Sequence, residues 1–257
     1  MTYENLLYEV RNGISTITVN RPKVLNALNR ATIAELHSAF IAARDDEAVR
    51  VIIITGAGEK AFIAGADISE LHEFPTSGAL GSRDSLPMLI LGLGKPVIAA
   101  INGYCFGGGF ELVYACTLAY AAEGAKFGQP EVNLGLNPLW GATQQLPSLV
   151  GKKKAMEVLL LGEMFDAHEA LRLGIINGVV PPKELMSRVR SVAATLATKA
   201  PIAVKVILEC VRQAGDVTLA QGMDLEAKGF GLVRETEDFI EGTKAFREKR
   251  PPQFRGR

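Results

Sequence analysis

Two glutamates, Glu111 and Glu131, are the residues of this 257-residue chain whose setting most favours acid/base chemistry. Glu111 is the only formal charge between Pro96 and Ala122, and Glu131 directly follows Pro130. A buried carboxylate is strongly disfavoured unless it is paired, hydrogen-bonded or protonated. Two carboxylates in apolar surroundings can therefore exchange protons near neutral pH. The alternative is that both are solvated residues of a loop and a helix start.

Three consecutive glycines, Gly107 to Gly109, precede Glu111 and are predicted to open a helix. The first N–H groups of a helix have no partner within it and lie at the positive end of its dipole. A carbonyl oxygen that gains negative charge can be stabilised there, because no Cβ blocks its approach. The alternative is that the glycines only allow the helix to pack closely on a strand.

A second candidate donor lies in the segment Phe62–Ile68, just beyond the predicted strand Val51–Thr55. Its small residues leave the backbone open to a ligand, so the Ala66 N–H can serve as this donor. The alternative is an ordinary turn into a helix capped by Asp67. The preceding run Gly56–Ala61 fits a degenerate dinucleotide-binding pattern, but no clean amphipathic helix follows it, which favours a surface turn.

The composition is that of an ordinary globular protein, with 48% hydrophobic and 22% charged residues. Lys+Arg and Asp+Glu number 28 each, so no global charge attracts the chain to nucleic acid or to an anionic membrane. The N-terminus lacks the pattern of a signal peptide. Glycines, Asn102 and Glu111 interrupt the long apolar run 96–122 and argue against a membrane span. Three scattered cysteines indicate a reducing compartment, and we expect a cytoplasmic protein.

Hydrophobic patterning predicts an α/β core in the first two thirds of the chain. Asn12 and Gly13 between two alternating runs indicate a hairpin, and two continuous apolar runs indicate strands buried on both faces. The hairpin strands are Leu7–Arg11 and Ile14–Val19, and the buried strands are Val51–Thr55 and Val97–Ile101. A helix is predicted over Ala31–Arg44, with Ile33, Leu36, Phe40 and Ile41 on its inner face.

The long connection 56–95 is predicted to contain more than one short helix, and connections of this length inside a domain are usually functional. Beyond Gly151 the chain becomes mainly helical. We expect helices at Lys154–Leu161 and Ala167–Leu173, a last strand at Ile175–Val180, and amphipathic helices over 183–249 that break near Pro201 and Gly215.

Five stretches of this chain, in order, resemble the enoyl-CoA hydratase/isomerase (crotonase) family. They are Asn20–Leu28, Lys60–Ile68, Lys95–Leu112, Lys126–Gly135 and Glu237–Arg250. The resemblance implies an α/β fold with a spiral core of ββα units over residues 1–195 and a helical C-terminal trimerisation region over 196–257. It also implies a homotrimer, or a homohexamer built as a dimer of trimers.

The resemblance also implies an acyl-CoA site. The thioester oxygen would rest between the N–H groups of Ala66 and Gly108. The substrate would contact Lys23, Val24, Leu25, Ala64, Asp67, Ile68, Ser69 and Trp140. Family members that hydrate enoyl-CoA carry two glutamates, which match Glu111 and Glu131, whereas isomerases commonly keep only the second. No metal or separate cofactor is implied, because coenzyme A is part of the substrate.

The implied reaction is reversible addition of water to a 2-enoyl-CoA, which gives 3-hydroxyacyl-CoA. Glu111 would orient and deprotonate the water that attacks the β-carbon, and Glu131 would deliver or remove the proton at the α-carbon. One alternative is a double-bond isomerase that uses Glu131 alone, and another is a hydratase specialised for an unusual acyl group. A third is a non-catalytic CoA- or RNA-binding homologue, which both carboxylates and the zero net charge disfavour.

Several positions depart from the family pattern. Thr117 stands where Asp is common, and Gln145 where Arg is common. Leu139 and Trp140 stand where small residues are common. Our hypothesis is that Leu139 and Trp140 narrow the acyl pocket towards short or branched chains. The alternative is that Trp140 only packs in the core.

Overall fold

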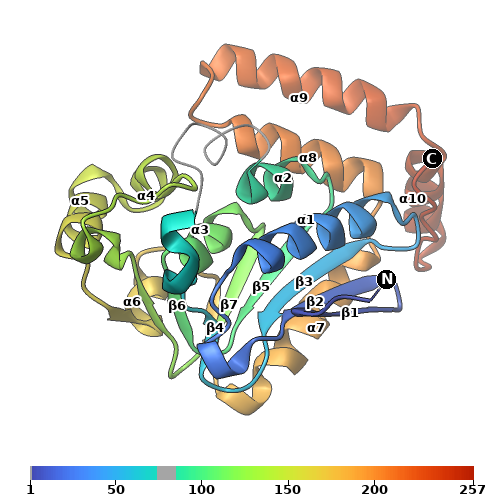
Figure 1. Cartoon of the computed structure of the whole chain (residues 1–257). Coiled ribbons are helices and arrows are strands. Elements are labelled where there is room, and N and C mark those ends of the chain that lie inside the picture. The colour runs from blue at the N-terminus through green and yellow to red at the C-terminus, as the bar shows by residue number, and fades with distance from the viewer. Residues whose placement is uncertain (1, 74–84) are drawn as a thin grey trace.

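The computed structural model describes residues 2–73 and 85–257, which fold into two sheets flanked by helices (Figure 1). The larger sheet has the strand order β1-β2-β3-β5-β7-β10, and all its pairs are parallel except β1 with β2. Its strands are β1 (Leu6–Arg11), β2 (Ile14–Val19), β3 (Val51–Gly56), β5 (Val97–Ile101), β7 (Leu118–Ala122) and β10 (Gly178–Val180).

Both faces of this sheet are covered, so its central strands are buried throughout. Every residue of β3 and β5 is buried. Ile52 and Ile54 of β3 share one core cluster with Leu36 and Phe40 of helix α1 (Arg30–Asp45). The alternate residues Val51 and Ile53 share a second cluster with Leu185 and Val189 of helix α7 (Leu185–Ala197). Successive side chains of a strand point to opposite faces of the sheet, so alternate residues of β3 pack against α1 on one face and against α7 on the other.

The smaller sheet has the order β4-β6-β8-β9, and only its last pair is antiparallel. Its strands are β4 (Ala61–Ile63), β6 (Tyr104–Phe106), β8 (Lys126–Gly128) and β9 (Phe165–Asp166). Each is two or three residues long, and β4, β6 and β8 follow soon after β3, β5 and β7 along the chain. The loops that leave these short strands carry the residues of the candidate site.

Short helices connect and flank the two sheets. The 3₁₀ helices are η1 (Pro22–Val24), η2 (Ile68–Glu73), η3 (Pro130–Leu134) and η4 (Pro182–Glu184). The α-helices are α2 (Leu86–Gly92), α3 (Gly108–Ala115), α4 (Ala142–Val150), α5 (Lys152–Leu161) and α6 (Ala167–Arg172). Among them, α3 begins at Gly108, the second of the three consecutive glycines that were predicted to open a helix. It carries Glu111 in its first turn.

The last three helices stand at one edge of the molecule, at the upper right of Figure 1. They are α8 (Pro201–Gln213), α9 (Leu219–Arg234) and α10 (Glu237–Glu248). The chain after α10 returns along it, because the buried Asp238 carboxylate accepts the N–H groups of Arg255 (2.6 Å) and Gly256 (2.8 Å). These two bonds fix the extended C-terminal segment in place.

Most of the predicted elements are confirmed, including the hairpin, the two buried strands and the helices of the C-terminal half. Two details are wrong. Ile41 is 38% exposed, and the inner face of α1 is completed by Thr32, Ala39 and Ala43. The last strand spans only Gly178–Val180. The connection 56–95 contains the short helices η2 and α2, as predicted, and also the strand β4; the smaller sheet was not predicted.

Candidate active site

Glu111 is a nearly fully buried carboxylate, only 2% exposed, on the first turn of α3. Its Oε1 accepts hydrogen bonds from the N–H groups of Trp140 (2.7 Å) and Ala142 (3.1 Å), where α4 begins. Burial raises the pKa of Glu111 to about 7, the charge of Glu131 adds to this rise, and the backbone hydrogen bonds oppose it. The group can therefore both accept and release a proton near neutral pH.

Glu131 lies in the first turn of η3, held behind Pro130. Burial raises its pKa, and its Oε2 is buried without a hydrogen-bond partner among the described residues. Its Oε1 lies against Gly107, where a Cβ would come within 2.9 Å of that oxygen. Gly107 also has a φ of +51°, so position 107 favours glycine for both reasons.

The two carboxylates lie at the same end of α3. The Glu111 N–H donates to the Gly107 carbonyl (2.9 Å), and the Glu131 carboxylate contacts that same residue. Their proximity is also evident in the pKa of Glu111, which the Glu131 charge raises. The fold therefore brings together both residues of the predicted acid/base pair.

Gly108 supplies one free main-chain donor beside the carboxylates. It is the first residue of α3, so its N–H has no acceptor within the helix. Within residues 2–73 and 85–257, no group accepts a hydrogen bond from this N–H. The donor therefore points out of the helix start, at the positive end of its dipole.

Ala66 supplies a second free donor, because of the register of a short parallel bridge with Leu28. The Leu28 N–H donates to the Gly65 carbonyl (2.8 Å), and the Asp67 N–H donates to the Leu28 carbonyl (2.9 Å). The peptide between Gly65 and Ala66 is planar and trans, so its N–H points opposite to its carbonyl and hence away from Leu28. No acceptor for it occurs in the described ranges of the chain.

The loops that carry these two donors are in contact. The Gly65 Cα lies 3.6 Å from the position that a Cβ on Gly107 would occupy, and a Cβ on Gly65 would lie 3.4 Å from the Phe106 carbonyl oxygen. Each donor belongs to the residue that follows one of these two glycines. Two unbonded N–H groups thus come from neighbouring loops, beside two carboxylates of raised pKa.

The segments predicted to contact coenzyme A run next to each other. Lys23 and Val24 lie in η1, and Leu25 follows it with a left-handed φ of 54°. The Ala64 N–H donates to the Leu25 carbonyl (3.2 Å), which joins the two segments. Ile68 and Ser69 open η2, where Ile68 is exposed, and the Ser69 hydroxyl donates to Asp67 Oδ1 (2.7 Å).

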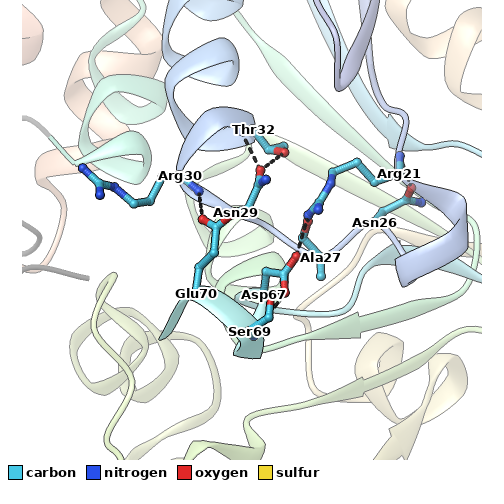
Figure 2. Close-up of polar contacts among 9 residues, drawn as sticks. All are labelled: Arg21, Asn26, Ala27, Asn29, Arg30, Thr32, Asp67, Ser69 and Glu70. Carbon is cyan, nitrogen blue, oxygen red and sulfur yellow. Dashed lines mark hydrogen bonds and ion pairs between the residues drawn. The ribbon is translucent and has the colours of Figure 1, made fainter. Parts of the chain in front are cut away.

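Two residues that the sequence did not single out hold these segments, and Figure 2 shows both. Arg21 Nη1 donates to the Ala27 carbonyl (2.6 Å) and to Asp67 Oδ2 (2.9 Å). The fully buried Asn26 accepts the Arg21 N–H (3.0 Å) and donates to the carbonyls of Ala57 (3.0 Å) and Ala61 (2.8 Å). Both lie in the stretch Asn20–Leu28 that resembles the family, but the sequence alone assigns neither of them this role.

Trp140 lies against the start of α3. A Cβ on Gly108 would stand 3.4 Å from its Cζ3 and 3.7 Å from Leu28 Cδ1, so the indole ring lies close beside one free donor. Leu139 is half exposed next to it. Both residues also line a cavity of about 1060 Å³ between α2, α3, α4 and α8.

No three His, Cys, Asp or Glu side chains gather into a group that could hold a metal ion in the described part of the chain. No single helix within those ranges is long and apolar enough to cross a membrane. In the same ranges, one helix pair, Pro182–Ala197 with Pro201–Gln213, has the combined length and apolar composition of a span, but the two helices are bent by 109°.

The fold is that of a known enzyme family. The family model described as enoyl-CoA hydratase/isomerase matches residues 9–257. The enoyl-CoA hydratase from Bacillus anthracis superposes with a TM-score of 0.92 at 35% identity, covering 99% of this chain and 100% of the other. The chain belongs to the enoyl-CoA hydratase/isomerase family and has the crotonase fold.

Among its relatives are two enzymes named for short substrates. The crotonyl-CoA hydratase of Syntrophomonas wolfei is 42% identical, over 99% of both chains. The short-chain-enoyl-CoA hydratase of Clostridium acetobutylicum is 39% identical, over 97% of both chains.

Proposed function

We propose that this protein is an enoyl-CoA hydratase, which reversibly adds water to a 2-enoyl-CoA to give a 3-hydroxyacyl-CoA. The observation that carries the proposal is the pair Glu111 and Glu131, a buried and a partly buried carboxylate of raised pKa at one end of α3. An isomerase needs only one such group, and a binding protein needs neither. The relatives named as hydratases support the same reaction.

The N–H groups of Ala66 and Gly108 would bind the thioester carbonyl oxygen. Attack of water on the β-carbon moves electron density onto that oxygen, and two fixed donors stabilise this charge more than they stabilise the neutral substrate. Loss of one such donor typically lowers a rate by about 10²–10³-fold. Neither donor has to break a bond within the described protein to meet the substrate.

Glu111 would act as the general base. Its Oε1 is held by two backbone N–H groups. The attacking water gives a proton to Glu111 as its oxygen bonds to the β-carbon. Glu131 would give a proton to the α-carbon, and the electron pair of the carbon–carbon double bond forms that new C–H bond. A proton then returns from Glu111 to Glu131 through solvent, and the reverse sequence dehydrates the product.

The remaining predicted contacts would bind the rest of the substrate. Coenzyme A would lie along the joined segments Lys23–Leu25 and Ala64–Ser69. Trp140 and Leu139 would limit the acyl group, since the indole ring lies beside Gly108. This favours short or branched acyl chains. Undiminished turnover along a series of enoyl-CoA esters from four to sixteen carbons would contradict such a limit.

The test is the loss of enoyl-thioester absorbance when purified protein meets crotonyl-CoA. We expect rapid loss with the wild-type protein, and a decrease of about 10²–10⁴-fold in kcat for Glu111→Gln and for Glu131→Gln. Glu47→Gln, which changes an exposed glutamate, is the matched control and keeps the wild-type rate. No absorbance loss in the wild type, with CoA binding intact, would reject a short-chain hydratase. Double-bond migration that survives in Glu111→Gln would favour the isomerase.

We also propose that the helices α8, α9 and α10 form the contacts of a homotrimer, or of a hexamer made from two trimers. This rests on the family resemblance and on the apolar side chains that these helices expose.

A further inference from the structure

We propose that the ion pair between Arg21 and Asp67 is a positioning device that aims the Ala66 N–H at the substrate carbonyl oxygen. The inference rests on the proposed function and extends it to two residues that touch neither the reacting atoms nor the acid/base pair. Figure 2 shows the guanidinium between the two segments that carry the ion pair.

The Arg21 guanidinium joins the two segments directly. Its Nη1 donates to the Ala27 carbonyl (2.6 Å) in one segment and to Asp67 Oδ2 (2.9 Å) in the other. The two side chains are 18% and 15% exposed, so solvent competes little with the pair. Hydrogen bonds between ionised partners are stronger than neutral ones, and the pair therefore restrains both ends of the contact.

The restraint reaches Ala66 through the main chain. Ala66 lies between two hydrogen bonds to Leu28, one through the Gly65 carbonyl and one through the Asp67 N–H. The direction of the Ala66 N–H is set by the plane of the Gly65–Ala66 peptide. Since Ala27 and Asp67 are the neighbours of Leu28 and Ala66, the guanidinium fixes the bridge at the residues adjacent to it.

The segment needs such a restraint because it is strained. Leu25 and Asn26 have φ values of 54° and 58°, in the left-handed region that residues with a Cβ rarely adopt. The side chain of Asn26 holds the segment on the side of Ala57 and Ala61. The Arg21 guanidinium holds the segment on the side of Asp67. Hydrogen bonds on both sides therefore maintain its left-handed conformation.

Both carboxylate oxygens of Asp67 accept hydrogen bonds from the protein. Its Oδ1 accepts the Ser69 N–H (3.2 Å) and hydroxyl (2.7 Å), and its Oδ2 accepts from Arg21. These hydrogen bonds, chiefly that of the Ser69 side chain, lower the pKa of Asp67. The carboxylate stays ionised and engaged, as a positioning residue requires.

The direct readout is the polarisation of a bound thioester carbonyl. The probe is the CoA thioester of 4-(dimethylamino)cinnamic acid, a donor–acceptor chromophore whose absorbance moves to the red when its carbonyl oxygen is hydrogen-bonded. We expect a red shift with the wild-type protein and a smaller one with Asp67→Asn and with Arg21→Met. For crotonyl-CoA we expect kcat to fall by about 10–100-fold, since small misplacements have effects of this size, while KM changes far less.

Three further variants separate positioning from folding. The double variant Arg21→Met/Asp67→Asn should lose little more than either single variant, because both act through one contact. Arg21→Lys should recover only part of the shift, since a lysine cannot span both acceptors with a planar fork. Arg44→Met removes the exposed ion pair with Asp45 at the far end of α1 and should leave shift and kcat unchanged.

A full red shift in both Asp67→Asn and Arg21→Met would overturn the proposal, as would a loss of kcat that matches a loss of folded protein measured by circular dichroism. Absence of any red shift in a wild-type protein that equilibrium dialysis shows to have bound the probe would overturn it too. If the wild type shifts the probe and the variants do not, yet crotonyl-CoA is not hydrated, the positioning role stands and the proposed reaction fails.

Discussion

Glu111 shows how a single side chain can be held at an intermediate pKa. Burial favours the neutral carboxyl group, while two backbone N–H groups favour the charged carboxylate. Burial prevails only in part, and the pKa rises to about 7. A carboxylate without those donors would be a stronger base but would lose its orientation, and a solvated one would be too weak a base at neutral pH.

The raised pKa of Glu111 predicts an acid limb in the pH dependence of the reaction. Because the deprotonated form is the base, kcat/KM for crotonyl-CoA should decrease as the pH falls below about 7. The measurement is a pH series from 5 to 9, and Glu47→Gln should give the same limb as the wild type. An unchanged limb in the residual activity of Glu111→Gln would assign it to another group.

The same shift predicts that Glu111 destabilises the fold at alkaline pH. The folded state holds this proton up to about pH 7, whereas the unfolded chain releases it near 4.5, so stability decreases as the pH rises through this window. The effect is on the order of 3 kcal/mol for a shift of this size. Glu111→Gln should therefore be more stable than the wild type at pH 8.

Urea unfolding at pH 8 and at pH 4 checks this prediction, because the advantage of Glu111→Gln should be lost at the lower pH. An equal difference between the two proteins at both values would show that the proton is not involved. Such a trade between stability and activity is common at sites that bury charge.

At the scale of elements, α3 and β4 hold the site together by close contact. A Cβ on Gly109 would lie 2.3 Å from the Ile63 carbonyl oxygen and 2.7 Å from the Ile63 Cβ, and main-chain atoms cannot move away. Gly109→Ala should therefore destabilise the protein by about 1–3 kcal/mol, as overpacking does. It should also lower kcat, since α3 carries Gly108 and Glu111.

Gly92→Ala is the matched control for this substitution. Gly92 ends α2, and no atom of the described residues lies within 4 Å of a Cβ added there. Thermal unfolding should show a neutral or slightly stabilising change there. If Gly109→Ala also unfolds at the wild-type temperature, the contact between α3 and β4 is less rigid than its geometry implies.

The sequence predicts the long elements well and the short ones poorly. The strands β3 and β5 are continuous apolar runs, and α1 has a clear helical period over sixteen residues. The strands β4, β6, β8 and β9 are too short to show any period, so the smaller sheet has no sequence signature. Ile41 fits the helical period but lies at the margin of the buried face.

Some residues of the candidate site can likewise be predicted from the sequence, and others cannot. Glu111 and Glu131 are conspicuous because their neighbours are apolar, and Gly107 to Gly109 because they are consecutive. The bonds of Arg21 to Asp67 and of Asn26 to Ala57 and Ala61 join residues 31 to 46 positions apart, and no local pattern encodes such pairs. The freedom of the Ala66 N–H depends on a bridge register, which only the folded chain defines.

In the molecule as a whole, the C-terminal helices expose many large apolar side chains to solvent. Large exposed side chains on α8, α9 and α10 are Ile207, Val211, Leu219, Met223, Phe230, Leu232, Ile240 and Phe246. Patches of this kind mark interfaces between proteins. The proposed trimer would bury them, and the boundary between core and helical region near residue 196 stays a prediction.

Phe246 offers a test of this assembly, because it is 85% exposed in the single chain. Burial of a phenylalanine contributes about 2–3 kcal/mol, and a glutamate in its place disfavours the contact in every copy. Phe246→Glu should sediment as a smaller species than the wild type. Ala194→Glu, on the exposed face of α7, should not change the sedimentation, and a wild-type monomer would refute the trimer.

The three cysteines, Cys105, Cys116 and Cys210, are free thiols. The cytoplasmic location inferred from them stays a prediction.

The bridge between Leu28 and Ala66 leaves a main-chain hydrogen, and not a side chain, pointing away from the partner strand. Only proline lacks that hydrogen. Any other residue at position 66 would keep it and would differ solely in what its side chain presents. Substitutions at this position could thus alter which substrates are accepted without deleting the donor. Ala66→Pro, which lacks the N–H, would be the negative control.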